Sequence, residues 1–184
     1  MFAFIAASAA ILLTPGPTNT LLAAGGATLP LRKAFLLPLA EALGYGLAVS
    51  GFFLMARGLQ DRPEAFVAVK LAAAAWLVYA AVTLWRTRLD AGGHPPRLAF
   101  GRVLATTLVN PKALLVGVVF IPQQPFSGAL AWIGAYAGLS ILAGIGWVFL
   151  GSLLPGRLQR HSYKGAALVL TGFSLAAVAS AVAS

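Results

Sequence analysis

Hydrophobic residues along the chain gather into six long runs separated by short polar links. The runs cover residues 2–24, 34–56, 65–85, 102–122, 128–154 and 165–183. Each is close to the length of about 20 residues that an α-helix needs to cross the hydrocarbon core of a bilayer. The runs lack the alternation of apolar and polar residues that marks a transmembrane β-strand. The pattern therefore predicts an all-α integral membrane protein with six transmembrane helices.

Composition supports a lipid environment. Of the 184 residues, 60% are hydrophobic and 9% are charged, with a mean hydropathy of +0.89. A soluble domain carries about 25% charged residues. Four acidic residues cannot cover a water-exposed surface of this size. The first run lacks the preceding basic residues of a signal peptide, so we expect it to be retained as a helix.

The basic residues are concentrated in alternate links. The first, third and fifth links hold nine of the thirteen Lys and Arg residues, and the links of the other side hold three. The positive-inside rule then places the odd-numbered links in the cytoplasm and both termini outside, as in a multi-pass protein of a bacterial inner membrane. In a soluble protein, a net charge of +9 suggests nucleic acid. Here the charge suits lipid headgroups, so we expect no nucleic-acid partner.

Proline interrupts two of the runs. The first run contains Thr-Pro-Gly-Pro-Thr-Asn at residues 14–19, and the fourth contains Asn-Pro-Lys at residues 110–112. Proline removes a helical hydrogen bond and clashes with the preceding turn. Asn110 and Pro111 read as the N-cap and first residue of a new helix. A helix start in mid-membrane is costly unless it faces a polar cavity. We expect both breaks to line a path for a solute.

The breaks occupy corresponding places in the two halves of a single transmembrane domain. Residues 1–92 and 93–184 each hold three runs, and each half opens with a broken one. Three spans per half give the halves opposite orientations. This is the 3+3 inverted repeat of many secondary transporters, whose solute site lies where the broken helices meet.

Both motifs together resemble those of the lysine exporter (LysE) superfamily, including its homoserine/threonine exporter branch. The resemblance covers the whole chain: its length, its six runs and both motifs in register. It implies export of amino acids or similar small zwitterionic metabolites across a bacterial inner membrane, driven by proton antiport. The chain departs from the family pattern at Trp76, where tyrosine is common, and at Glu41, where many members carry a small or apolar residue.

Candidates for substrate binding and translocation follow from the breaks and from charges inside the runs. They are Pro15, Gly16, Pro17, Thr18, Asn19, Glu41, Asn110, Pro111 and Lys112. A lysine at mid-span costs at least about 2.5 kcal/mol, so Lys112 should face protein or water. Beside a helix start its ammonium suits a carboxylate, although it can instead snorkel or pair structurally.

Glu41 is the candidate for proton coupling, because a carboxyl in a low-dielectric site can bind and release a proton near neutrality. It can equally bind the ammonium of a solute or pair structurally with Lys112, Arg32 or Lys33. Thr18 and Asn19 can donate to a solute or satisfy backbone groups freed by the break. Tyrosine and tryptophan are assigned to packing and interface anchoring, and the Gly-x-x-x-Gly at Gly134 and Gly138 to close helix approach.

Other functional classes have less support. An enzyme needs a nucleophile with a base or several convergent acids, and the runs supply little beyond Glu41 and Lys112. We expect no cofactor and no metal site, since His, Asp and Glu lack metal-ligand spacing and cysteine is absent. A homodimer is plausible for six helices. The alternatives to amino-acid export are a non-transporting membrane subunit and an exporter of another solute.

Overall fold

The computed structural model describes residues 1–59 and 96–153, together with scattered positions between residues 61 and 82. All regular structure in these ranges is helical. The elements are α1 (Phe2–Leu13), α2 (Pro17–Thr28), α3 (Leu31–Ala34), α4 (Leu37–Gly58), α6 (Pro96–Leu108), α7 (Pro111–Leu115), the π-helix η1 (Val116–Phe120) and α8 (Phe126–Leu153). The predicted run 165–183 lies outside the described residues, and the run 65–85 is described only at scattered positions.

Several helices are long and apolar enough to cross a membrane. Three qualify singly, Leu31–Gly58, Ala99–Phe120 and Phe126–Leu153. The pair α1 and α2, bent by 60°, adds a fourth if it counts as one broken span. These segments correspond to the first, second, fourth and fifth predicted runs. The described part of the chain is thus that of an all-helical, multi-pass membrane protein with a broken N-terminal span.

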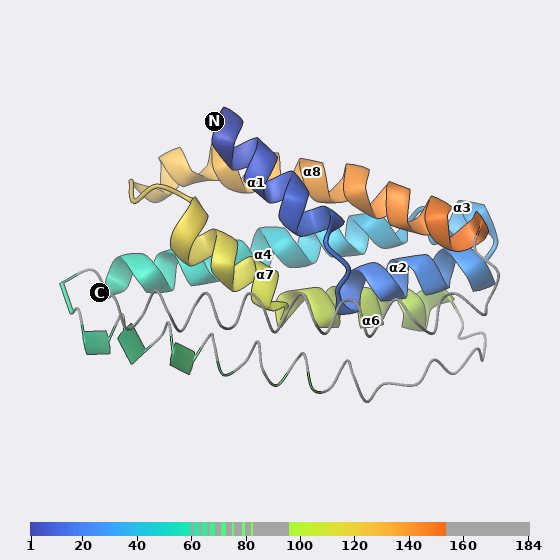
Figure 1. Cartoon of the computed structure of the whole chain (residues 1–184), viewed down its shortest axis with the longest axis horizontal. Helices are drawn as coiled ribbons and strands as arrows, with labels where there is room; N and C mark the ends of the chain where they lie inside the picture. The colour runs from blue at the N-terminus through green and yellow to red at the C-terminus, as the bar shows by residue number, and fades with distance from the viewer. Residues whose placement is uncertain are drawn as a thin grey trace.

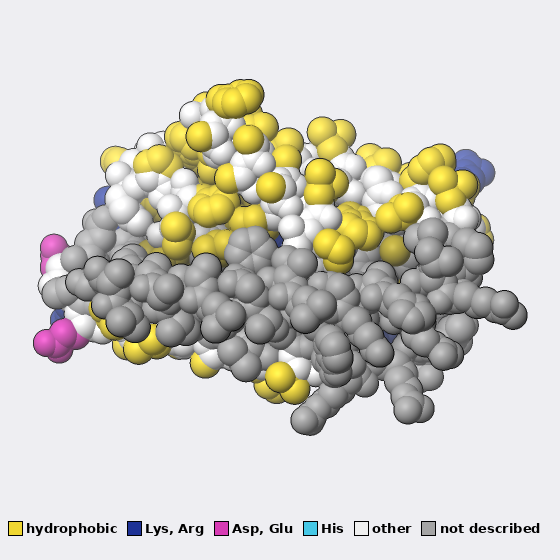
Figure 2. All heavy atoms as spheres, in the orientation of Figure 1, with side chains coloured by type: hydrophobic (Ala, Val, Ile, Leu, Met, Phe, Trp, Pro, Cys, Tyr) yellow, Lys and Arg dark blue, Asp and Glu magenta, His cyan; other side chains and the backbone are white. Residues whose placement is uncertain are grey.

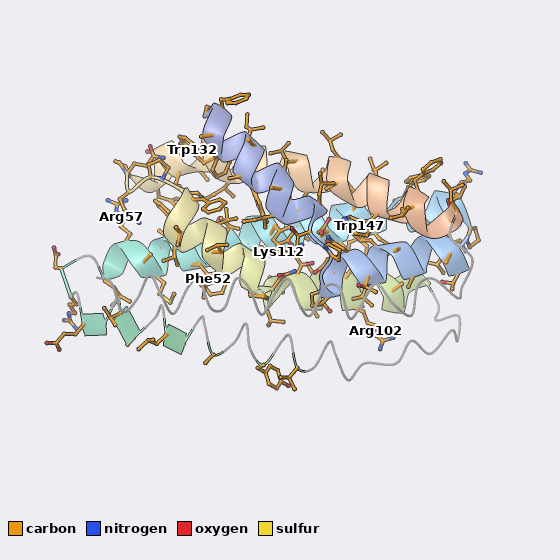
Figure 3. The ribbon with its side chains drawn as sticks, viewed as in Figure 1. Phe52, Arg57, Arg102, Lys112, Trp132 and Trp147 are labelled. Atoms are coloured by element: carbon orange, nitrogen blue, oxygen red, sulfur yellow. The ribbon has the colours of Figure 1, made fainter. Side chains whose placement is uncertain are left out.

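The fourth run begins earlier than its hydropathy indicates. Helix α6 starts at Pro96, in keeping with the preference of proline for the first turn of a helix. Arg102, the first residue of the predicted run, therefore lies inside this helix, exposed on its outer side (Figure 3). A long arginine side chain can reach polar surroundings from such a position while its stem covers apolar surface.

The long helices run alongside one another with their ends at two poles (Figure 1). The pole at α3 also holds the start of α4, the start of α6 and the end of α8. The opposite pole holds the end of α4 and the start of α8. Between the poles, α8 packs on α2, α4 and α1, and α4 packs on α6. The break between α1 and α2 lies roughly midway between the poles.

Helix α8 shows how small residues bring these helices together. Its buried residues form one stripe at helical spacing, Ala129, Ile133, Tyr136, Ser140, Gly144, Val148 and Gly151. At Gly151 a Cβ atom would overlap the backbone of Ala23 in α2, and at Gly26 one would overlap the backbone of Val148. The backbones of α2 and α8 therefore touch, as small residues permit between membrane helices.

The outer face of the molecule is apolar. Hydrophobic side chains cover the surface over α1 and α8 (Figure 2), and Leu13, Leu142 and Phe149 are all more than half exposed. Beneath them, one apolar core gathers around Tyr45, Phe53 and Tyr136, and a second packs α2, α4, α6 and α8 near the pole that holds α3. Buried polar side chains lie between these two cores and form what we call the polar layer. This layer contains the candidate site.

Candidate functional site

The first break places two prolines around an extended glycine. Helix α1 ends at Leu13, and Gly16 is the N-cap of α2 with φ −165° and ψ 176°. Pro17 is the first residue of α2. Proline fits that position because the amide hydrogen it lacks would have no helical partner there. Pro15 lies in the non-helical link, and Gly16 is buried.

The second break has the predicted helix start. Helix α6 ends at Leu108, and the Asn110 side chain accepts a hydrogen bond of 3.0 Å from the backbone nitrogen of Lys112. Pro111 is the first residue of α7. The capping prediction for Asn110 and Pro111 is confirmed. The continuation is less regular than expected, because α7 passes directly into η1. Such π-helical turns are rare and often lie at functional sites.

The two breaks touch each other. Lys112 Nζ donates a hydrogen bond of 2.6 Å to the carbonyl oxygen of Thr14. Asn110 Nδ2 donates to Thr18 Oγ1 at 2.9 Å. A Cβ atom on Gly16 would lie 3.3 Å from both Cε and Nζ of Lys112. Figure 3 places Lys112 in the middle of the molecule, beside the junction of α1 and α2. We call this set, Thr14, Gly16, Thr18, Asn19, Asn110 and Lys112, the break cluster.

Asn19 in the break cluster serves the backbone. Its Nδ2 donates to Leu12 O and to Thr14 O, both at 2.8 Å. Trp147 Nε1 of α8 also donates to Leu12 O, at 3.3 Å. Leu12 and Thr14 carry some of the last carbonyls of α1, which have no partner inside the helix. Of the two roles predicted for Asn19, the structure places it in the second, the satisfaction of backbone groups freed by the break.

A buried tyrosine pair extends the polar layer toward α8. Asn110 Nδ2 donates to Tyr45 Oη at 3.2 Å. The rings of Tyr45 and Tyr136 meet edge to face, with centroids 5.0 Å apart, and both side chains are fully buried. Sequence reasoning assigned these tyrosines to packing. The available signal was the spacing of Tyr45 from Glu41, since residues four apart share a helix face.

Glu41 faces the same layer from α4. It is 1% exposed, and its Oε2 has no hydrogen-bond partner. This oxygen lies against α8, where a Cβ on Gly144 would be 2.9 Å away. Glu41 and the buried Lys112 are near enough to interact electrostatically. Because Oε2 is unpaired, the structural pairing considered for Glu41 is not made through that oxygen.

The space beside the site, between α1 and α8, is apolar. A pocket of about 240 Å³ lies between α1 and α8, lined by Ala9, Leu12, Leu13, Leu139, Leu142 and Ala143. Pro111 is buried, while Pro15 and Pro17 are half-buried. In the described ranges, His, Asp and Glu do not form a group of three that could hold a metal ion.

Comparison of the chain with models of protein families, with curated proteins and with solved structures finds no match. The break cluster and Glu41 therefore have to be interpreted from their own chemistry.

Proposed function

We propose that this protein is a secondary-active exporter of amino acids or similar small zwitterionic metabolites across a bacterial inner membrane, working by proton antiport. We further propose that it is a member of the lysine exporter superfamily, which its motifs resemble. The proposal also includes six transmembrane helices arranged as a 3+3 inverted repeat, with broken first and fourth helices.

The observation that carries the proposal is the contact between the two breaks. Lys112 of the second break donates to the Thr14 carbonyl of the first at 2.6 Å. Irregular backbone at membrane depth is tolerated where it is buried in protein or lines a cavity, and in transporters such breaks hold the solute. A structural subunit has no need for two broken helices, a mid-span ammonium and a buried carboxyl in one layer.

The charges in this layer suit a zwitterion. Lys112, 4% exposed, offers an ammonium to a carboxylate. Glu41 offers a carboxyl that has an unpaired oxygen in the apolar interior. A charged carboxylate left without a partner there costs several kcal/mol. We therefore expect the Glu41 carboxyl to be either protonated or paired with a positive charge. This is the behaviour required of a group that carries a proton against a solute.

Export is tested by growth and flux. An efflux-deficient bacterium producing the chain is challenged with amino acids, amino-acid analogues and dipeptides. We expect resistance to one class of compound, lost in Lys112→Ala and kept in Lys33→Ala, which removes an exposed lysine of the first link. Absence of resistance to all of them, with the protein verified in the membrane, favours a non-transporting subunit or another solute.

Proton coupling is tested in everted membrane vesicles. We expect the vesicles to take up solute and a protonophore to abolish this uptake. We expect the Glu41→Gln variant to lose the uptake although it is present in the membrane in the same amount as the unchanged protein. Glu64→Gln is the matched control, because Glu64 is exposed at the end of the second link, outside the predicted spans. Uptake and pH dependence unchanged in Glu41→Gln would remove Glu41 from the mechanism while leaving export intact.

A further inference from the structure

The ammonium of Lys112 makes fewer hydrogen bonds than it can. An ammonium has three N–H donors, and within the described part of the chain Nζ donates to one acceptor, Thr14 O. The side chain is 4% exposed, so water cannot freely serve the other two. Donors left unused in a buried site are destabilising, and more so when the group is charged. The site is therefore built to receive a further acceptor, and a carboxylate is the strongest acceptor for an ammonium.

The acceptor that Lys112 uses does not depend on it. Thr14 O also accepts from Asn19 Nδ2 at 2.8 Å. If the ammonium moves away, this carbonyl keeps one hydrogen bond and is not stranded in the membrane interior. Asn19 also donates to Leu12 O, so a single side chain of α2 continues to satisfy the end of α1. The departure of Lys112 thus costs the backbone little.

Gly16 leaves one flank of the ammonium free of side-chain atoms. A Cβ there would lie 3.3 Å from Nζ and from Cε, closer than nearly all such contacts. Gly16 is extended and could accommodate a side chain by its backbone angles. A side chain at this position would therefore require the Lys112 side chain to shift by a few tenths of an ångström, so Gly16 bounds the space in which Lys112 lies.

We propose that the carboxylate of the transported solute draws the Lys112 ammonium off the Thr14 carbonyl. Asn19, which donates to Leu12 O and Thr14 O, and Trp147, which donates to Leu12 O, then hold the end of α1 without it. This inference rests on the proposed export function and adds a step to it. Lys112 is the link from α7 to the end of α1, so arrival of the solute releases α1 from the second break. Asn19 acts as a positioning residue in this step and does not bind the solute.

The experiment measures hydrogen–deuterium exchange of the full chain in lipid nanodiscs, in the peptide that covers residues 10–20. The probes are a mixture of the eighteen standard amino acids other than Asp and Glu and the matching mixture of their α-carboxamides. We expect a several-fold faster exchange with the amino acids and no change with the carboxamides, which lack the negative charge. Lys112→Met, which is similar in length but has no donor, should exchange faster without a solute and should not respond to either mixture. Lys33→Met serves as the control.

The outcomes separate this inference from the export function. An equal response to the carboxamides, or an unchanged peptide in a protein whose vesicles take up amino acids, overturns the exchange of Lys112 and leaves export standing. If the vesicles take up none of these solutes, the proposed function fails, and the exchange step fails with it. Because the wild-type comparison needs no substitution, a variant that does not fold cannot hide the result.

Discussion

Asn19 donates hydrogen bonds to two carbonyls at the end of α1, and removing its side chain should destabilise the fold. Asn19→Ala takes one donor from Leu12 O and one from Thr14 O. We expect a loss of about 1–3 kcal/mol in stability, because buried carbonyls lose hydrogen bonds. Thermal unfolding in detergent measures it. Thr28→Ala is the control, since this exposed hydroxyl bonds only within its own helix. Equal effects of the two substitutions would contradict the role given to Asn19.

The tyrosine pair allows a contrast between two similar changes. Tyr45→Phe removes the hydroxyl that accepts from Asn110 Nδ2, and we expect a loss of about 1 kcal/mol. Tyr136 Oη is buried and lacks a hydrogen-bond partner of acceptable geometry. Tyr136→Phe should therefore be neutral or stabilising. Both values come from the same unfolding measurement, and a larger loss at Tyr136 would mean that its hydroxyl has a partner in the working protein.

Local rules account for part of the site. The residue types and their order predict Asn110 as an N-cap and Pro111 as a first helical residue, because capping depends on neighbours in sequence. The same rules do not decide whether Pro15 or Pro17 starts the second half-helix, and the structure has Pro17. The hydrogen bonds of Asn19 with α1 and of Asn110 with Tyr45 depend on how helices are placed in space, so the sequence alone does not give them.

At the scale of helices, a four-residue spacing of small residues predicts only some of the close contacts. The Gly-x-x-x-Gly at Gly134 and Gly138 has open space around it in the described part of the structure, whereas Gly44, which is spaced in this way from Ala40, lies against Thr107 of α6. Other close approaches are at Gly26, Gly117, Gly144 and Gly151. A four-residue spacing occurs often by chance in a chain with 20 glycines. Which spacing meets a partner depends on the rotation of the helix, and the buried stripe of α8 fixes that rotation.

Two substitutions in α8 test this assignment. Gly151→Ala places a methyl group against the backbone of Ala23, which cannot move aside as a flexible side chain can. We expect α2 and α8 to separate, with a loss of about 1–3 kcal/mol, typical of overpacking. Gly134→Ala should change stability little. The fraction of folded protein after heating in detergent reports both. A loss at Gly134 as large as that at Gly151 would show that a further surface packs on this face.

At the scale of the molecule, hydropathy predicts the spans that the structure describes. The runs 34–56, 102–122 and 128–154 each correspond to one candidate span, the second of them broken at Asn110, and the run 2–24 corresponds to the bent pair. Length and apolarity suffice for this, because a membrane requires nearly continuous helices of fixed length. The full count of six helices, the inverted repeat and the orientation remain predictions.

The orientation can be measured because the chain has no cysteine. Thr28 and Ser127 are both exposed and polar. Thr28 is the last residue of α2 and Ser127 lies in the first turn of α8, and these two helix ends lie toward opposite poles (Figure 1). We expect Ser127→Cys to react with a membrane-impermeant maleimide in intact spheroplasts, and Thr28→Cys to react only after lysis, because the positive-inside rule predicts that the basic first link lies in the cytoplasm. The reverse labelling would place the termini inside.

The backbone contact between α2 and α8 gives the broken first span two arms of unequal stiffness. The α2 arm is joined to α8 where Gly26 and Gly151 leave no gap, so these helices resist sliding. The α1 arm meets α8 through the edge-to-face contact of Phe4 with Trp132 and the hydrogen bond from Trp147 to Leu12 O, beside a pocket of about 240 Å³ lined by small and aliphatic side chains. We therefore expect α1 to move more readily than α2 when the span changes shape, turning at the Thr14–Gly16 link.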